Sequence, residues 1–411
     1  MSEKLTAMFL KTFRLKNFKA IRDSGVVTFT PLTALIGYNG SGKSSLIEGL
    51  QTYQHIVTQG LDEAMHRWRG FEYIHNPPEK VSFFGSSRTD VEPISFELTG
   101  SAWVQDDYLI DMQVAIMPTN FVLIKSEQVG FHSIDFASRD SGGAIKFSGV
   151  SDADLHMPRL QGNVSALVNY YVDAYFGVPG VVADSVNEIT AMQHLSRSIP
   201  SWHFVNLNPY VMAQPKIQTR SSEQIILNED GSNIAEYLLD IRQRDEGAFM
   251  GIVEALRQVL PYADSLQPTL TTELGRSVHL QLTEGEMVIP GWLLSTGTLR
   301  VVALLALLRH PNPPPLIVID EIENGLDPRT LNFLVEEMRN TVESGASQII
   351  LTTHSPYLLD LLSLSQIVLV ERTQSGETVF TRPADDKSLR EWSTRFAPGM
   401  LYTSGRLSTL A

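Results

Sequence analysis

The sequence predicts an α/β fold with a mixed sheet, and three patterns along the chain support that prediction. Near the C-terminus, continuous apolar segments alternate with helical ones, which is typical of a parallel sheet covered on both faces. Residues 31–37 form an apolar segment that ends in glycine, and helical spacing follows at 43–59. Residues 9–21 alternate as strands do, which predicts an antiparallel lobe at the N-terminus.

The middle of the chain separates into a strand-rich and a helix-rich part. The strand-rich part reads as a meander or antiparallel arm, with segments at 81–87, 94–100, 108–118 and 121–131. The helix-rich part runs from about 160 to 265, with segments at 164–177, 233–243 and 247–263. We therefore expect three divisions of the chain: an N-terminal lobe at 1–60, an insertion at 61–290 and a C-terminal lobe at 291–411.

Composition narrows the class of protein. Hydrophobic residues make up 43% of the chain and charged residues 19%, which suits a globular protein with a sizeable core. No apolar run reaches the roughly 18 residues needed to span a bilayer, and we expect no membrane association. There are no cysteines, which excludes disulfides and cysteine-based chemistry. The start of the chain lacks a secretory h-region, so we expect a cytoplasmic protein.

The net charge of −14 is unevenly distributed. Residues 1–60 carry +4 and residues 291–411 carry −3, so the middle of the chain holds −15. Such an acidic segment is a poor surface for DNA phosphates. Two interpretations remain open for it, a solubilising surface or an acidic face on which a partner protein docks.

A glycine-rich phosphate-binding loop is predicted between the apolar strand and the first long helix. Residues 37–44 match the pattern G-x-x-x-x-G-K-[ST] in full. Glycines allow backbone N–H groups to surround phosphate oxygens, and the following helix directs its positive end at the same anion. Lys43 would reach the β- and γ-phosphates, and the Ser44 hydroxyl would ligate Mg²⁺. The expected ligands of the nucleotide in this loop are Gly37, Asn39, Gly40, Ser41, Gly42, Lys43, Ser44 and Ser45.

A pair of carboxylates follows a second apolar strand. Asp320 and Glu321 end the segment LIVIDE, and ligands bind at the C-terminal ends of strands in open α/β sheets. We expect Asp320 to hold Mg²⁺, directly or through water, and Glu321 to polarise the attacking water.

Two weaker signals accompany this pair. The segment LSTGTLR places Ser295 and Gly297 before an apolar helix, where a helix N-terminus and a hydroxyl form an anion site. Ser295 is equally suited to capping that helix. The segment LTTHSP ends a strand with His354, which is either structural or part of the site.

Taken in order, the phosphate loop, LSTGT, LIVIDE, NGLDP and TTHSP resemble the motifs of the ATPase head shared by ABC, SMC, RecF and OLD-type proteins. The segment LKNFKAI, with Asn17, Phe18 and Lys19, resembles the SMC and RecF side rather than the transporters. The resemblance covers about residues 9–55 and 290–373. It implies an ABC-type P-loop ATPase head with a mixed sheet, an N-terminal antiparallel strand lobe and a largely helical insertion.

The resemblance also implies a composite site with ATP and Mg²⁺. Two heads would pair head to tail, as a homodimer or a higher even oligomer. One subunit would supply the phosphate loop, Asp320, Glu321 and His354, and the other would supply Ser295, Gly297 and, across the dimer, Asp327. His354 would contact the γ-phosphate or the water. Because ATP would bridge the two halves, nucleotide state would control the geometry of the dimer.

Three functions remain open at this point. Stand-alone heads of this kind often accompany nucleases or toxins in bacterial anti-phage systems, which implies an ATP-hydrolysing switch with a separate effector protein. A RecF-like ATPase would instead bind duplex DNA, with phosphate contacts from Lys11, Arg14, Lys16 and Lys19. A module that holds ATP without turnover is disfavoured by Glu321. About 38 residues follow residue 373, so we expect no Toprim nuclease domain, and the family's glutamine loop has no clear position.

Overall fold

The computed structural model consists of two compact units, each built from separate stretches of the chain. Unit 1 comprises Met1–Trp202, Leu364–Glu391 and Gly405–Ala411, and unit 2 comprises His203–Ser363 and Trp392–Ser404. The structure describes residues 9–76, 92–102, 106–117, 121–131, 134–140, 145–147, 166–168, 186–219, 224–271 and 276–408. The predicted strand at 81–87 and most of the predicted helix at 164–177 lie outside these residues.

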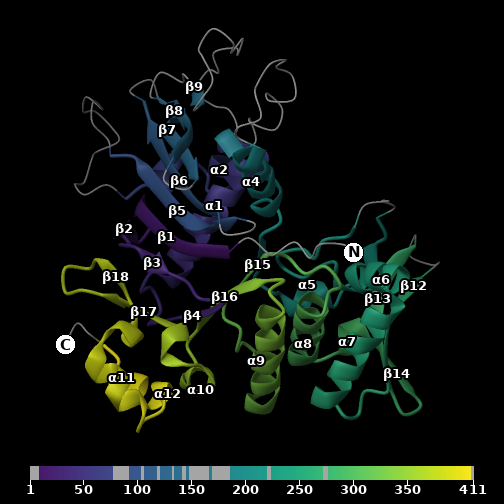
Figure 1. Cartoon of the computed structure of the whole chain (residues 1–411). Helices are drawn as coiled ribbons and strands as arrows, with labels where there is room; N and C mark the ends of the chain where they lie inside the picture. Colours follow the sequence, from purple (N-terminus) through teal and green to yellow (C-terminus); the bar gives the residue numbers. More distant parts are fainter. Residues whose placement is uncertain are drawn as a thin grey trace. The chain divides into compact units, whose positions relative to one another are not determined.

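A large antiparallel sheet forms the first part of unit 1 (Figure 1). Its strand order is β2-β1-β5-β6-β7-β8-β9, and β3 also pairs with β1. The strands are β1 (Phe9–Phe18), β2 (Ile21–Asp23), β3 (Val27–Thr28), β5 (Ile94–Ala102), β6 (Asp106–Ile116), β7 (Val122–Phe131), β8 (Ile134–Arg139) and β9 (Ile145–Phe147). The predicted antiparallel character of the N-terminal lobe is therefore confirmed.

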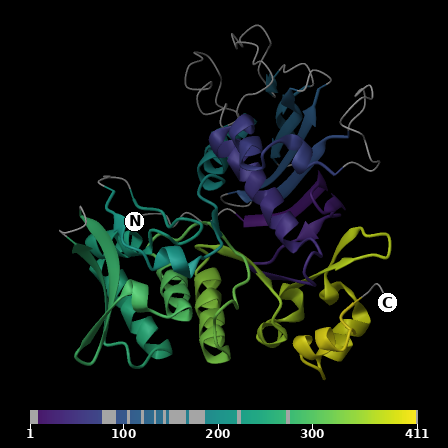
Figure 2. The ribbon, with the colours of Figure 1, turned by 180° about the vertical axis from the view of Figure 1, so that it is seen from behind.

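One face of this sheet is apolar because its strands alternate between buried and accessible positions. Three helices pack on it: α1 (Lys43–Gln59), α2 (Leu61–Arg67) and α4 (Val186–Ser198). In Figure 2, α1 and α2 lie across the strands. A Cβ at Gly49 would meet the Leu15 side chain at 2.3 Å, so α1 can approach β1 this closely only with glycine there.

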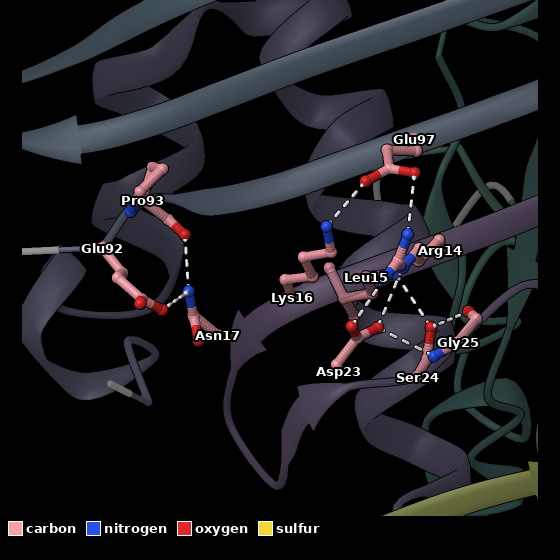
Figure 3. Close-up of polar contacts among 10 residues, drawn as sticks. All are labelled: Arg14, Leu15, Lys16, Asn17, Asp23, Ser24, Gly25, Glu92, Pro93 and Glu97. Atoms are coloured by element: carbon pink, nitrogen blue, oxygen red, sulfur yellow. Dashed lines mark hydrogen bonds and ion pairs between the residues drawn. The ribbon is translucent and has the colours of Figure 1, made fainter. Parts of the chain in front are cut away.

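The opposite face of the sheet carries paired charges (Figure 3). Arg14 donates to Asp23 through Nε at 3.0 Å and Nη2 at 2.7 Å, and its Nη1 lies 3.7 Å from Glu97. Lys16 Nζ lies 3.1 Å from the same Glu97. The hydrogen bond from Arg14 is the main cause that lowers the pKa of Asp23. The basic side chains of β1 on this face therefore have carboxylate partners within their own unit.

A buried carboxylate on β7 makes the stability of unit 1 depend on pH. Glu127 accepts the Leu167 N–H at 2.8 Å and lies 3.6 Å from Arg139 Nη2. Burial raises its pKa to about 7, although Arg139 and the Leu167 N–H act in the opposite direction. At pH values between the ordinary pKa of a glutamate and about 7, Glu127 is protonated more in the folded chain than in the unfolded chain. Stability therefore falls as pH rises through this window, and no further above it.

We expect the Glu127→Gln variant to lose this part of the pH dependence. Between pH 5 and pH 8, the free energy of unfolding of the wild type should fall by about 2 kcal/mol relative to the variant. Urea unfolding at several pH values measures the difference, with the exposed Glu343→Gln as the control. A difference that does not change with pH would contradict the prediction.

Unit 1 also contains a small mixed sheet that carries the phosphate loop. In it, β17 (Ile367–Arg372) pairs in parallel with β4 (Leu32–Ile36) and antiparallel with β18 (Thr378–Thr381). Every residue of β4 is buried, as the apolar segment predicts. The loop begins directly after this strand and ends where α1 begins.

Unit 2 contains a parallel sheet, a separate antiparallel sheet and a group of helices. The parallel strands are β10 (His203–Val205), β15 (Leu316–Ile319) and β16 (Gln348–Thr353), with β15 in the middle. The antiparallel sheet contains β11 (Lys216–Ile217), β12 (Ser265–Thr271), β13 (Ser277–Glu284) and β14 (Met287–Pro290).

Unit 2 contains several helices, one of which is largely buried against others. They are α5 (Pro209–Met212), α6 (Ile234–Arg244), α7 (Glu246–Val259), α8 (Thr296–Leu308), α9 (Pro328–Glu343), α10 (Pro356–Asp360) and α12 (Pro398–Thr403), while α11 (Lys387–Ser393) spans the boundary between the units. Nearly all of α8 is buried, and it packs against α5, α7 and α9. Arg309 at its end binds both carboxylate oxygens of Glu337 on α9, at 2.5 and 2.8 Å. In the described part of the chain, no helix is both long enough and apolar enough to span a bilayer.

Candidate nucleotide site

In the phosphate loop, residues 37–44, two positions accommodate only glycine. A Cβ at Gly37 would lie 2.0 Å from the Val370 carbonyl oxygen of β17. Gly42 has φ of 117°, and a Cβ there would lie 2.6 Å from Thr378 Cγ2. The glycines therefore let the loop pack directly against β17 and β18, where any side chain would collide.

The polar groups of the loop suit a polyphosphate and a divalent cation. Lys43 is buried, and its Nζ donates to the carbonyls of Gly37 at 2.8 Å and Tyr38 at 3.1 Å. Among the described residues, the buried Ser41 Oγ has no hydrogen-bond partner. Ser44 is exposed in the first turn of α1, where its hydroxyl can reach a hydrated cation. The remaining predicted ligands in the loop are exposed at Asn39 and Gly40 and half-buried at Ser45.

The acidic loop, residues 320–327, follows β15 and is tied to the end of β16. Thr352 Oγ1 donates to Asp320 Oδ1 at 2.6 Å and accepts the Glu321 N–H at 2.7 Å. Glu321 has φ of 47°, a left-handed backbone that costs a non-glycine residue about 1 kcal/mol. Strain of this kind is typical of functional sites, and here it sets the direction in which Glu321 leaves the strand.

The Glu321 carboxylate lies beside His354. Its Oε1 is 3.8 Å from His354 Nε2, and its Oε2 accepts a hydrogen bond from Asn324 Nδ2 at 2.5 Å. The His354 N–H donates to Glu323 Oε1. Both Glu321 and His354 remain partly exposed, so water can reach them. Unit 2 therefore brings together three of the predicted site residues, namely Asp320, Glu321 and His354.

The loop that precedes α8 contains the other predicted anion contacts. Ser295 is the N-cap of α8: its Oγ accepts the Thr298 N–H at 3.1 Å and pairs with the Thr298 hydroxyl at 2.8 Å. Ser295 is nevertheless exposed. A Cβ at Gly297 would lie 2.5 Å from the Gly325 carbonyl oxygen, so this loop packs directly on the acidic loop.

Asp327 caps α9. Its Oδ1 accepts the N–H groups of Arg329 at 2.9 Å and Thr330 at 3.2 Å, and its Oδ2 accepts the Thr330 hydroxyl at 2.5 Å. These hydrogen bonds, the one from the Thr330 hydroxyl most of all, lower the pKa of Asp327. The side chain is exposed, so its role as a cap leaves its predicted role across a dimer open.

Substitutions at Asp327 should separate capping from any other role. We expect Asp327→Ala to lower the free energy of unfolding by about 1 kcal/mol, because two N–H groups of α9 lose their acceptor. Asp327→Ser, which keeps a capping oxygen, should recover most of that loss. Thermal or urea unfolding measures both variants. Equal destabilisation by Ser and Ala would contradict the capping role, whereas a turnover defect in the stable Ser variant would indicate a second role.

The sequence patterns did not predict several polar residues around the C-terminal ends of the parallel strands. Thr352 and Asn324 hold the two carboxylates, but threonine and asparagine in these places form no motif of their own. Arg300 on α8 donates to the Leu207 carbonyl at 2.9 Å, and burial lowers its pKa while Glu321 acts in the opposite direction. Asn206 and Asn208, which follow β10, and Asn228, Glu229 and Asp230, which precede α6, line an open pocket of about 600 Å³.

Gln54 on α1 has a structural role. Gln54 Nε2 donates to three carbonyls, those of Ile199, Pro200 and Trp202, and the side chain is buried. A different amide residue, Asn206, lies directly after β10, which is the parallel neighbour of β15. The Asp320 N–H donates to Val205, the last residue of β10, so amide side chains follow a strand next to the one that carries the acidic loop. An amide residue directly after a strand that pairs with the acidic-loop strand was the signal that would have identified these side chains.

Comparisons with known proteins find matches to parts of this chain and to most of it. A family model described as "AAA domain, putative AbiEii toxin, Type IV TA system" matches residues 194–360, and one described as "AAA ATPase domain" matches residues 8–53. The OLD nuclease of Thermus scotoductus is 21% identical over 421 residues, with 98% of this chain and 70% of the relative covered.

Solved structures with similar folds include SMC heads. The SMC head bound to the C-terminal winged-helix domain of ScpA matches with a TM-score of 0.52 and 14% identity, over 91% of this chain and 97% of that one. The SMC head domain from Thermotoga maritima has a TM-score of 0.43 and 14% identity, over 91% and 98% of the two chains.

The fold and the sequence matches support an ABC/SMC/OLD-like ATPase head, as the sequence resemblance predicted. The chain resembles AAA-type ATPase domains and the OLD nuclease of Thermus scotoductus in sequence, and an SMC head in fold.

Proposed function

We propose that this chain hydrolyses ATP with Mg²⁺ as a head-to-tail dimer, and that its nucleotide state controls a separate effector protein. In this proposal, the phosphate loop holds the triphosphate through backbone N–H groups and Lys43. Ser44 and Asp320 hold Mg²⁺, which neutralises charge on the phosphates. Glu321 orients the attacking water and accepts its proton, with His354 beside it.

The observation that carries this proposal is the geometry of the acidic loop. One carboxylate, Asp320, is held by a buried hydroxyl, and the next, Glu321, turns away from the strand on a left-handed backbone and faces a histidine 3.8 Å away. A carboxylate that serves only the core would be buried and fully paired, whereas the Glu321 side chain is 46% exposed. This arrangement leaves one carboxylate for the metal and one for water.

Ser295, Gly297 and Asp327 are the residues that we propose to act on the partner's nucleotide. Ser295 and Asp327 are exposed at the N-termini of α8 and α9, and the glycine contact between residues 297 and 325 holds their loops together. The N-terminus of α8 suits the negative charge of a γ-phosphate. At α9, whose first N–H groups are capped, we propose that the exposed Asp327 carboxylate itself acts across the dimer.

We further propose that the effector is a nuclease or toxin of an anti-phage system, as the sequence resemblance implies. The larger family match carries the description of a toxin in a type IV toxin–antitoxin system, and one relative is an OLD nuclease. The acidic middle of the chain, with a net charge of −15, suits docking of a basic protein rather than of nucleic acid.

The alternative, a RecF-like ATPase that binds DNA, receives less support from the N-terminal cations. Lys11, Arg14, Lys16 and Lys19 each have a carboxylate partner in unit 1, namely Asp107, Asp23, Glu97 and Glu48. A phosphate would have to compete with these ion pairs. Fluorescence anisotropy with duplex DNA tests the alternative, because true phosphate binding weakens steeply between about 50 and 200 mM salt.

Light scattering of the Glu321→Gln variant tests the proposed function. With ATP and Mg²⁺, the variant should form a dimer. In protein that also carries Ser295→Cys and Tyr38→Cys, the cysteine at 295 of one subunit should crosslink to the cysteine at 38 of the other. The wild type should hydrolyse ATP and return to its starting state. A protein that neither turns over ATP nor changes mass with ATP would overturn the proposal. Capture of a partner by the trapped dimer alone would extend it to the effector.

A further inference from the structure

One buried hydroxyl contacts both carboxylates of the acidic loop. Thr352 is the second-last residue of β16, and its side chain is fully buried, with 0% exposed. Its Oγ1 donates to Asp320 Oδ1 at 2.6 Å and accepts the Glu321 N–H at 2.7 Å. A hydroxyl has a single proton. When the Thr352 hydroxyl donates that proton in a hydrogen bond to Asp320, only the lone pairs of its oxygen remain to accept the Glu321 N–H. The two hydrogen bonds are therefore compatible with each other and together define the rotamer.

The register of the parallel strands produces this contact. Ile319 of β15 pairs with Leu351 of β16, so Asp320 and Thr352 follow at the same level. All six residues of β16 are buried, and threonine has few rotamers because it is branched at Cβ. The hydroxyl is thus a rigid point beside Asp320 and Glu321, the first two residues of the acidic loop.

We propose that Thr352 is a positioning residue, which sets the metal-binding carboxylate Asp320 and the water-orienting carboxylate Glu321 at the same time. The inference rests on the proposed function for the roles of these two carboxylates. Its effect on Glu321 acts through the backbone. The left-handed φ of 47° is held by an N–H bond to a fixed oxygen, while Asn324 and His354 act on the side chain.

Three variants test the proposal in the full-length protein. Thr352→Val keeps the shape of the side chain but removes both hydrogen bonds. Thr352→Ser keeps the hydroxyl and should restore function. Thr353→Val is the matched control, because Thr353 is equally buried but its Oγ1 accepts the Ser355 N–H at 3.0 Å and contacts neither carboxylate in the described structure.

We expect Thr352→Val to lower kcat for ATP about 10- to 100-fold, which is the range for partners that orient metal ligands. The affinity for Mn²⁺, measured by electron paramagnetic resonance with a non-hydrolysable ATP analogue, should fall by a similar factor. The affinity for the analogue without metal should not change. Thr352→Ser and Thr353→Val should stay close to the wild type in all three measurements.

Hydrogen exchange gives a readout that does not depend on activity. The amide of Glu321 should exchange at least tenfold faster in Thr352→Val than in the wild type, because it loses its acceptor, and this difference should be absent in Thr353→Val. Unchanged exchange at Glu321 overturns the inference, whether or not the protein hydrolyses ATP. If Thr352→Val does not fold, Thr352→Ala replaces it in every measurement.

The outcomes separate the inference from the function on which it rests. If the wild type binds no Mn²⁺–nucleotide and shows no turnover, the proposed function fails, while the exchange experiment still tests the contact. If the wild type is active and Thr352→Val exchanges faster but keeps normal kcat and Mn²⁺ affinity, the positioning role is overturned. Faster exchange together with both losses supports it.

Discussion

Replacement of Glu321 by Gln should lower ATP turnover by about 10²- to 10⁴-fold while leaving ATP binding intact. A positioned general base contributes a factor of this size, and the amide removes the base without changing the shape of the side chain. The hydrogen bond between Asn324 Nδ2 and Oε2 can be kept by the amide oxygen of the new residue. Steady-state phosphate release and the affinity for a fluorescent ATP analogue together measure the effect.

The control for this experiment is Glu343→Gln, which removes one exposed carboxylate from α9 of the same unit. It should leave turnover unchanged. His354→Gln forms a second comparison, because His354 Nε2 faces Glu321 Oε1 at 3.8 Å. This substitution should lower turnover by a smaller factor than Glu321→Gln. Equal turnover in wild type and Glu321→Gln would mean that this carboxylate is not the base, and that the chain holds ATP without using Glu321.

Replacement of Gly37 by Ala should have the largest effect on the phosphate loop. The new Cβ would lie 2.0 Å from the Val370 carbonyl oxygen and 2.8 Å from Ser41 Oγ, and the first of these is backbone in a parallel strand pair. Since β17 cannot move without breaking its pairing with β4, the loop itself must shift. We expect a loss of about 3 kcal/mol in the free energy of unfolding and at least tenfold weaker ATP binding.

Gly40→Ala is the matched variant in the same loop. Gly40 has open space around its Cα, so the substitution meets no atom, but its φ of 76° is unfavourable for alanine. It should cost about 1 kcal/mol. Urea unfolding and nucleotide titration compare the two variants. A Gly37→Ala protein as stable as Gly40→Ala would show that β17 and the loop are not packed as closely as described.

Local sequence patterns were sufficient wherever neighbouring residues decide the structure. The helix predicted at 43–59 has those bounds in α1, because a glycine turn at one end and Gly60 at the other limit it. The same holds for the apolar strand β4. α9 begins at Pro328, directly after its cap Asp327. In these segments, periodicity and capping residues lie within a few positions of each other, so no distant contact is needed.

The hairpin sheet of unit 2 was not found in this way. Strand β12 contains Pro268, which argues against a strand because proline cannot donate to a ladder. The structure tolerates it because β12 is at the edge of the order β11-β13-β12. Position within a sheet, and with it the tolerance for proline, depends on which strands pair, and pairing is decided by distant parts of the chain.

The sequence by itself determined the chemistry that this protein carries: a phosphate loop, a pair of carboxylates after an apolar strand, and a histidine after another. These are contiguous motifs whose residue types suffice to name them. Only the tertiary structure decided how the carboxylates are held, since Thr352 reaches Asp320 and Glu321 through the register of two strands about 30 residues apart. It also paired the basic side chains of β1 with carboxylates of β2, β5 and β6. Such pairings are set by strand order, which no local pattern records.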